Sequence, residues 1–288
     1  MSWGSTYLTI TEFLPHGRPL LVAAMRVAPA GLVLLVAGRL VGPWRPRGVE
    51  WGRTALLALC NFGLFFPLLV IAVDRLPGGT AAAVGGIQPL LVAGLSWAIT
   101  GRRPLPRDIL IGLAAVIGVG LVVVRPGAGV DVAGVVAAAG ANISFATGVV
   151  LTKRFSAPVN RLAATGWQLL LGAVLLVPLM LVVEGAPPHL EARNIAGFAY
   201  LSLIATALAF VAWFSGVRRL PNAVPPLLGL AAPVTGAVLG WVVRGESLSP
   251  VQLFGFVVAV GAIAAGATLG AVNRPSTRAA RVLLPVGS

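Results

Sequence analysis

One stretch of this chain recurs without a gap, because residues 75–106 match residues 219–250 at a constant offset of 144. Ten of the 32 positions are identical, and they include Pro89 with Pro233 and Trp97 with Trp241. A chain with such an internal repeat folds as two similar units. If each half holds an odd number of membrane spans, the second half lies upside down in the bilayer relative to the first.

Composition indicates that the solvent around this chain is lipid. Apolar residues make up 58% of the sequence and charged residues 10%, and the mean hydropathy is +0.95, which is too apolar for a soluble fold. The net charge of +13 does not indicate nucleic-acid binding, because the arginines stand at the ends of apolar runs and form no basic face. Cys60 is the single cysteine, so no disulfide and no thiolate metal site is expected.

Apolar runs of about 20 residues, each about 30 Å long as a helix, predict an all-α membrane protein. We expect ten transmembrane helices as two inverted five-helix repeats. The spans are residues 2–14, 19–38, 54–73, 79–99, 108–124, 131–151, 162–183, 195–215, 222–243 and 251–272. The expected domains are a first repeat at 1–126, a second repeat at 127–272 and a cytoplasmic tail at 273–288.

The distribution of Lys and Arg predicts the orientation, since short cytoplasmic loops carry the excess. With the N-terminus inside, fifteen fall on the cytoplasmic side, five on the other side, and Arg26 falls within a span. Both termini are therefore expected in the cytoplasm. The first span has 13 residues, about 20 Å of helix, which is too short to cross. Either the true start lies upstream, which we favour, or the bilayer is thinned there.

The residue types argue against an enzyme. His16 and His189 both fall in loops predicted to face outside, so no histidine-based catalytic group is expected within the membrane. Lys153 has no glycine before it, which excludes a phosphate-binding loop of the Walker A type. We expect no catalytic residue, no cofactor and no metal.

Arg26 is the strongest site candidate, because a cation within a span needs a wet cavity, an anionic partner or the protein interior. In one interpretation Arg26 attracts a substrate carboxylate or phosphate. In a second it pairs with Glu12 or with loose carbonyls at a helix end, and in a third its side chain extends to the membrane interface. A shift of 142 aligns Arg26 with Gln168, so both halves hold a long polar side chain at the equivalent position. Two such groups are expected to flank a central cavity.

Further candidates line the same predicted spans. Each polar residue either contacts substrate or makes an interhelical hydrogen bond, and each aromatic residue either packs or stacks on a flat substrate. The substrate-binding or pathway candidates are Trp3, Tyr7, Arg26, Asn61, Phe65, Gln88, Asn142, Gln168, Thr206 and Trp213. Pro89 and Pro233 occupy equivalent places in the fourth and ninth spans and are expected to act as hinges.

Several short strings resemble the EamA-type members of the drug/metabolite transporter superfamily. They are Trp3-Gly4-Ser5-Thr6, the run from Leu203 to Phe210, Ala232-Pro233 and the run from Gly245 to Ser249. The resemblance covers both halves and implies a carrier of ten helices in the bacterial inner membrane, with a central cavity, which exports amino acids, metabolites or drugs. The first half departs from the pattern, with Arg102 where the second half has Glu246.

The expected function is a secondary carrier that moves small organic solutes outward by alternating access. Its partners are a small-molecule substrate and membrane lipids, and it works as a monomer or a homodimer without nucleic acid. Small multidrug carriers of the same superfamily use a glutamate in the first helix, which makes Glu12 the candidate for proton coupling; we expect a facilitator or a weakly coupled exporter. The alternatives are a translocase for lipids or lipid-linked sugars and a membrane scaffold that transports nothing.

Overall fold

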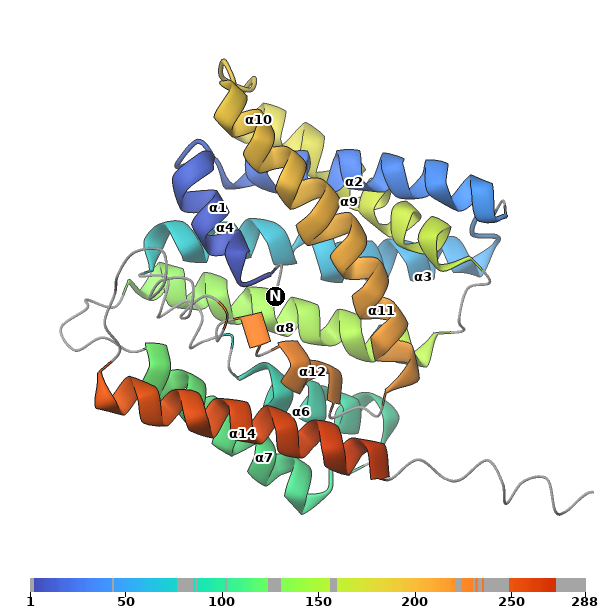
Figure 1. Cartoon of the computed structure of the whole chain (residues 1–288). Helices are drawn as coiled ribbons and strands as arrows, with labels where there is room; N and C mark the ends of the chain where they lie inside the picture. Colours follow the sequence, from blue (N-terminus) through green and yellow to red (C-terminus); the bar gives the residue numbers. More distant parts are fainter. Residues whose placement is uncertain are drawn as a thin grey trace, which may run out of the picture.

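The computed structural model describes residues 3–42, 44–76, 85, 87–101, 103–123, 131–155, 160–220, 224–229, 231–232, 235 and 249–272, and all regular structure in these ranges is helical (Figure 1). The first half contains α1 (Ser5–Phe13), α2 (Pro19–Val41), α3 (Val49–Ala58), η1 (Leu59–Gly63), α4 (Phe65–Arg75), α6 (Gln88–Thr100) and α7 (Pro106–Val123). The second half contains α8 (Val132–Arg154), α9 (Arg161–Val183), α10 (Ala192–Ala199), η2 (Tyr200–Leu208), α11 (Ala209–Arg219), α12 (Val224–Gly229) and α14 (Pro250–Val272).

Within the described ranges, five helical rods are long and apolar enough to cross a membrane. They are Pro19–Val41, Val49–Arg75, Val132–Arg154, Arg161–Val183 and Ala192–Arg219, and shorter apolar helices accompany them at Gln88–Ile99 and Pro250–Ala262. The prediction of an all-helical membrane protein is confirmed at this level, while the number of ten spans stays a prediction. Helix α1 has nine residues, in keeping with the short first span.

Helices α2 and α9 form a close pair that joins the two halves. Small residues allow the approach, since a side chain on Gly31 would stand 2.9 Å from the Leu170 side chain and one on Gly38 would stand 2.9 Å from the Ala163 nitrogen. On the other helix, a side chain on Gly166 would meet the backbone of Leu35 at 3.0 Å. The backbones therefore touch at several levels along the pair.

Polar side chains at both ends of this pair show that its helices run antiparallel. Glu184, just after α9, accepts hydrogen bonds from the N–H groups of Leu20 and Leu21 at 2.6 and 2.9 Å, which satisfies free donors in the first turn of α2. Asn160, just before α9, donates to the carbonyls of Gly38 and Gly42 at 2.7 and 2.6 Å, at the end of α2. An antiparallel pairing of the second helix of each half is what an inverted repeat requires.

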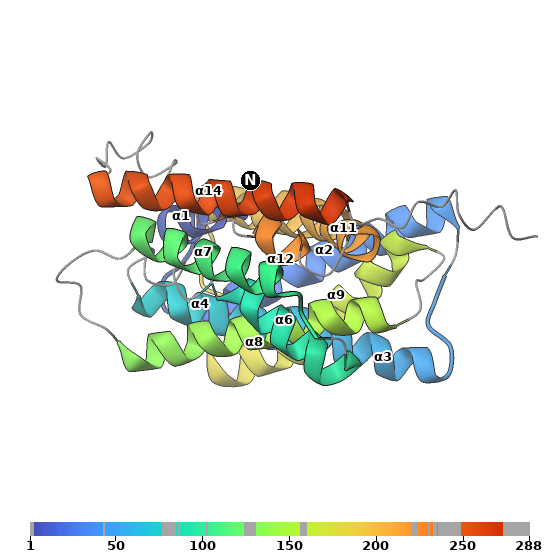
Figure 2. The ribbon, with the colours of Figure 1, turned by 90° about the horizontal axis from the view of Figure 1, so that it is seen from below.

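The last helices of the two halves, α7 and α14, lie side by side along one edge of the bundle (Figures 1 and 2). Gly118 meets the backbone of Ala259, because a side chain there would come within 2.5 Å of the Ala259 nitrogen. A separate small core forms at this contact. The larger core lies between α2, α4, α8, α9 and the rod that contains α11, and the buried rings of Phe62, Phe66 and Phe210 stand within it.

The third rod of each half contains a π-helical segment, η1 in the first half and η2 in the second. The offset of 144 places η1 on residues 203–207, which lie inside η2. In η1 the nitrogen of Leu64 bonds the carbonyl of Leu59 at 2.8 Å, five residues back, so the ordinary helical ladder is interrupted. The two halves therefore share the same irregularity at the same place. Figure 1 shows α10 and α11 as one rod that runs through η2 and crosses α2.

Contacts between helix ends form two groups, each among residues for which the Lys and Arg count predicts one side of the membrane; the orientation itself stays a prediction. One group contains the Arg75–Asp131 ion pair at 3.4 Å, the bond from Arg193 to the Glu12 carbonyl and the bond from Arg18 to the Ala186 carbonyl. The other contains the bond from Lys153 to the Leu220 carbonyl at 2.6 Å and the bond from Arg154 to the Ile99 carbonyl at 3.1 Å. Basic side chains near helix C-termini satisfy carbonyls that the helix itself leaves free.

Candidate functional site

Arg26 lies in the core and bonds the π-helical segment of the opposite half. Its side chain is 3% exposed, its Nε donates to the Thr206 hydroxyl at 2.6 Å and one terminal nitrogen donates to the Ala205 carbonyl at 3.1 Å. The guanidinium carbon also stands 4.3 Å from the centre of the Phe66 ring. A buried guanidinium needs such partners, because isolated burial of its charge is costly. We name these contacts the arginine clamp.

Gln168, the counterpart of Arg26, makes the matching contact in the other direction. Its Oε1 accepts a hydrogen bond from the Asn61 amide at 3.4 Å, and Asn61 belongs to η1. Each second helix of a half therefore bonds the π-helical segment of the other half. Arg26 and Gln168, which the shift of 142 aligns in the sequence, therefore make equivalent contacts in the two halves. Arg26 carries a charge and Gln168 does not. We name the second contact the amide clamp.

Carbonyls in both π-helical segments also accept bonds from the opposite half. The Trp3 indole donates to the Ala205 carbonyl at 3.0 Å, and the Ser144 hydroxyl donates to the Cys60 carbonyl at 2.8 Å. Trp3 precedes the first helix of the first half, and Ser144 lies in the first helix of the second half. An interrupted helical ladder leaves carbonyls available to such donors. The two halves therefore exchange equivalent polar contacts at their centres.

Aromatic rings from four segments cluster beside the arginine clamp. Phe65 stacks on Phe145 with ring centres 4.8 Å apart, and Phe145 in turn lies 6.0 Å from Trp213 with nearly parallel planes. Trp3 contacts the Phe210 and Trp213 rings at 5.1 and 5.0 Å. Such pairs bury large apolar surfaces and hold fixed ring orientations. Trp3, Phe65 and Trp213, predicted separately as site residues, are therefore members of one cluster.

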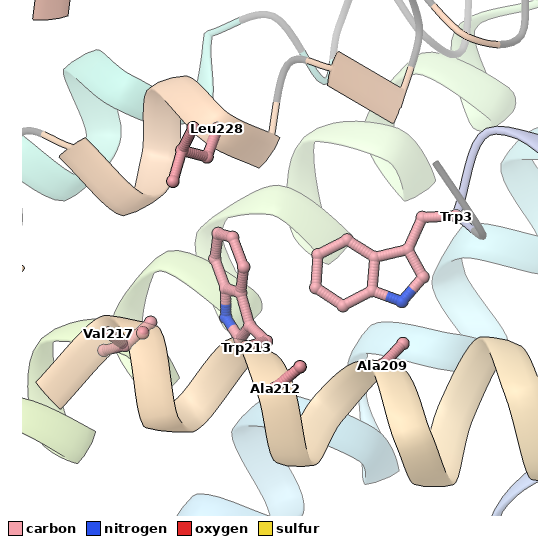
Figure 3. Close-up of a pocket in the computed structure, with 7 residues that line it drawn as sticks. Trp3, Ala209, Ala212, Trp213, Val217 and Leu228 are labelled. Carbon is pink, nitrogen blue, oxygen red and sulfur yellow. The ribbon is translucent and has the colours of Figure 1, made fainter. Parts of the chain in front are cut away.

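A cavity of about 300 Å³ opens beside this cluster (Figure 3). Two indoles and a set of small or aliphatic residues line it, namely Trp3, Trp213, Ala209, Ala212, Gly216, Val217 and Leu228. None of these side chains carries a charge. The Trp213 indole N–H is buried and has no hydrogen-bond partner in the described part of the chain. We call this cavity the tryptophan pocket.

Gln88 and Asn142 occupy different surroundings. Gln88 is the first residue of α6 and is 8% exposed, and its amide nitrogen has no partner among the described residues. Its Oε1 and the edge of the Trp213 ring lie 3.4 and 3.6 Å from the position that a side chain on Gly229 would occupy. Gln88 therefore lies close to the tryptophan pocket. The Asn142 amide instead donates to the Ala138 carbonyl in its own helix at 2.8 Å.

The remaining predicted residues lie apart from the clamps or outside the described ranges. Glu12 is exposed at the end of α1, where Arg193 bonds its carbonyl. Pro89 stands in the first turn of α6, where its missing N–H removes no helical hydrogen bond. Pro233 and the side chain of Tyr7 lie outside the described residues. The described part of the chain holds no group of three or more His, Cys, Asp or Glu side chains with which to bind a metal.

Sequence reasoning did not identify several participants. The Ala205 carbonyl is a backbone group, and hydropathy carries no signal for a π-helical segment. Gly148 was not singled out, yet a side chain there would come within 2.1 Å of Asn61 Oδ1. Phe66 was one of many aromatic residues until its contact with Arg26 distinguished it. The repeat offset was the available signal, since it brings η1 and η2 into register.

The fold and the site define a multi-pass helical membrane protein of two similar halves that meet at a polar and aromatic centre. Comparison with known proteins gives the family. The model of the EamA-like transporter family matches residues 1–124 and again residues 132–265. The chain therefore belongs to the EamA-like transporter family, which consists of transporters and not of enzymes.

Named relatives and a solved structure agree with this assignment. Protein PecM of Dickeya dadantii is 38% identical over 257 residues, which are 88% of this chain and 85% of that protein. The uncharacterized inner membrane transporter YedA of Escherichia coli is 28% identical over 270 residues, 91% of this chain and 85% of that protein. A crystal structure with 22% sequence identity matches with a TM-score of 0.79 over 94% of each chain, which shows the shared fold.

Proposed function

We propose that this protein is a secondary transporter that moves small organic metabolites out of the cell by alternating access. In this proposal, ten transmembrane helices form two inverted halves at 1–126 and 127–272. The chain lies in the cytoplasmic membrane of a bacterium with both termini and the tail at 273–288 in the cytoplasm. The antiparallel α2–α9 pair and the two groups of helix-end contacts support this topology.

The observation that carries the proposal is the pair of crossed clamps. Arg26 and Gln168, from the second helix of each half, bond the π-helical segment of the opposite half. Alternating access requires one half to rock against the other about contacts at the centre. Polar contacts to an irregular helical segment suit this role, because π-helical segments within α-helices are frequent at functional sites. The tryptophan pocket lies next to the arginine clamp and provides space for a solute, since Trp3 lines the pocket and also donates to the Ala205 carbonyl that Arg26 bonds.

The charges in the core favour a facilitator over a proton-coupled carrier. Among the described buried residues Arg26 is the one that carries a charge, and a buried carboxylate is the usual proton carrier in such membranes. Glu12 is exposed at the end of α1. Flux that does not respond to an imposed pH gradient supports the facilitator. Flux that a gradient drives, and that Glu12→Gln abolishes, overturns it.

Counterflow in proteoliposomes tests the transport proposal. Purified protein is reconstituted, vesicles are loaded with an unlabelled solute from a panel of amino acids, heteroaromatic compounds and lipid head groups, and uptake of the labelled solute is followed. We expect counterflow for at least one soluble compound. Ala212→Trp, which fills the tryptophan pocket, is expected to abolish it, while Val182→Trp at a residue that is 84% exposed leaves it intact. Counterflow with no member of the panel, or equal flux in Ala212→Trp, contradicts the proposal.

A further inference from the structure

We infer that the tryptophan pocket binds a planar, uncharged aromatic solute that carries a hydrogen-bond acceptor. This inference rests on the proposed transport function and names the class of substrate for the same site. It follows from the orientation of the two indoles, the lack of charge on the seven described lining residues and the positions of two buried donors. Each of these is a separate observation.

The two indoles present flat walls at a fixed angle. Trp3 and Trp213 have ring centres 5.0 Å apart and planes inclined at 61°. Figure 3 shows both rings on one side of α11, and Leu228 of α12 lies on that same side. Flat rings of this kind interact with the face or the edge of another ring beyond the gain from apolar burial. An aromatic solute matches these walls better than an aliphatic one of equal size.

The hydrogen-bond donors differ between the two indoles. The Trp3 N–H already donates to the Ala205 carbonyl, whereas the Trp213 N–H is buried without a partner. A buried donor without an acceptor costs free energy, and a solute with a carbonyl or a ring nitrogen supplies the acceptor. The solute is therefore expected to carry an acceptor on the edge of its ring.

Gln88 adds a second donor near the same ring. Its amide nitrogen is buried without a partner among the described residues. Its oxygen and the edge of Trp213 both lie within 3.6 Å of the position that a side chain on Gly229 would occupy. Because Gly229 has no side chain, nothing from that residue stands between the Gln88 amide and the indole. A solute in the pocket is thus expected to find donors from both α6 and α11.

The lining residues argue against a charged solute. All seven are uncharged, and a charged group placed against them loses its hydration without gaining a partner. The nearest buried cation, Arg26, already bonds the Thr206 hydroxyl and the Ala205 carbonyl. The volume of about 300 Å³ is at the lower end for ligand sites, which limits the solute to about two fused rings.

Equilibrium dialysis against the purified full chain tests the inference with three probes. The probes are 2-quinolone, which is a flat bicyclic lactam, its saturated analogue decahydroquinolin-2-one, and tryptophan as a zwitterion. We expect 2-quinolone to bind, the saturated lactam to bind at least tenfold more weakly, and tryptophan not to compete. Equal binding of the flat and saturated lactams overturns the inference, as does effective competition by tryptophan.

Variants locate the binding to the pocket. Trp213→Phe keeps a flat ring but removes the donor, and we expect it to weaken 2-quinolone binding about three- to tenfold, the usual effect of one lost hydrogen bond. Trp97→Phe, at a tryptophan that is 50% exposed, is the matched control. Gly229→Ala fits without a clash but places a methyl group between Gln88 and Trp213, and we expect a similar loss, with Gly94→Ala as its control. Binding of 2-quinolone to Trp213→Phe with the affinity of the unmodified protein overturns the inference.

Counterflow separates this inference from the transport proposal. If the protein exchanges amino acids but does not bind 2-quinolone, the inference about the solute class is overturned and the transport proposal stands. If the protein binds 2-quinolone but exchanges no solute, the transport proposal is overturned and the inference that the pocket binds this class of ligand stands. Exchange of a planar heteroaromatic solute that Trp213→Phe slows, with unchanged exchange in Trp97→Phe, supports both.

Discussion

The contacts of a single residue, Arg26, explain how a cation is accommodated in the core of the helical bundle. Its contacts in the described structure include a hydroxyl, a backbone carbonyl and an aromatic face, all within the protein. These contacts correspond to the reading in which the cation satisfies loose carbonyls, and here the carbonyl belongs to a π-helical segment and not to a helix end. We therefore propose that Arg26 positions η2 and that a solute is recognised beside it and not by its guanidinium.

Replacement of Arg26 distinguishes positioning from direct recognition of a carboxylate. We expect Arg26→Ala to destabilise the protein by about 2–4 kcal/mol, because it removes two hydrogen bonds from a charged group and leaves a cavity. Arg26→Gln, which copies Gln168, is expected to recover part of this loss. The melting temperature of detergent-solubilised protein measures the change.

The same variants are then compared in counterflow. Solutes with and without a carboxylate are expected to lose rate by the same factor in Arg26→Gln, because the altered residue holds η2 and does not touch the solute. A loss confined to carboxylate-bearing solutes contradicts this account and assigns Arg26 to substrate binding.

Gly148 offers a second test at the residue scale. A side chain there would overlap Asn61 Oδ1 at 2.1 Å and Asn61 Cγ at 2.7 Å, so Gly148→Ala must displace the amide that bonds Gln168. We expect a cost of about 1–3 kcal/mol from overpacking. Thermal unfolding measures it, with Gly120→Ala, at a glycine with open space around it, as the control. Because Asn61→Ala makes room for the methyl group, the double variant is expected to be less destabilised than the sum of the single variants; strict additivity would argue against the overlap.

At the scale of elements, the sequence predicted the apolar rods well and their internal geometry poorly. The rods of α2, α8 and α9 follow the predicted spans to within a few residues, because long apolar runs have one stable form in lipid. The π-helical segments were not predicted, since one extra residue per turn leaves the hydropathy unchanged. The contact between Glu184 and the start of α2 was missed for another reason, because it joins residues far apart in the chain.

Glu184 is expected to fix the start of α2. Its carboxylate accepts two backbone N–H bonds there, and a cap of this kind is worth about 1–2 kcal/mol. Glu184→Ala is expected to lower the melting temperature, and Glu184→Gln to lower it by less, since an amide oxygen replaces only part of the contact. His189→Ala, at an exposed loop residue, is the control. An unchanged melting temperature in Glu184→Ala would show that water replaces the cap at no cost.

At the scale of the whole molecule, two related halves meet through contacts that the duplication repeats. The sequence offset already placed Arg26 and Gln168 at equivalent positions, and the structure adds that each bonds the π-helical segment of the other half. What the offset did not predict is the asymmetry. One clamp is charged and short, whereas the other joins two neutral amides at 3.4 Å. The amide clamp is therefore expected to open first when the halves move.

Labelling of one pocket residue tests the central claim that the halves rock about these clamps. In a Cys60→Ala background, which removes the single cysteine, Ala212→Cys places a thiol in the tryptophan pocket. A maleimide that cannot cross membranes is added to right-side-out and to inside-out vesicles. If the halves rock about the clamps, the thiol is labelled from both sides, and a transported solute slows the labelling in each case. Labelling from one side alone, with the same rate in the presence of solute, would contradict the claim.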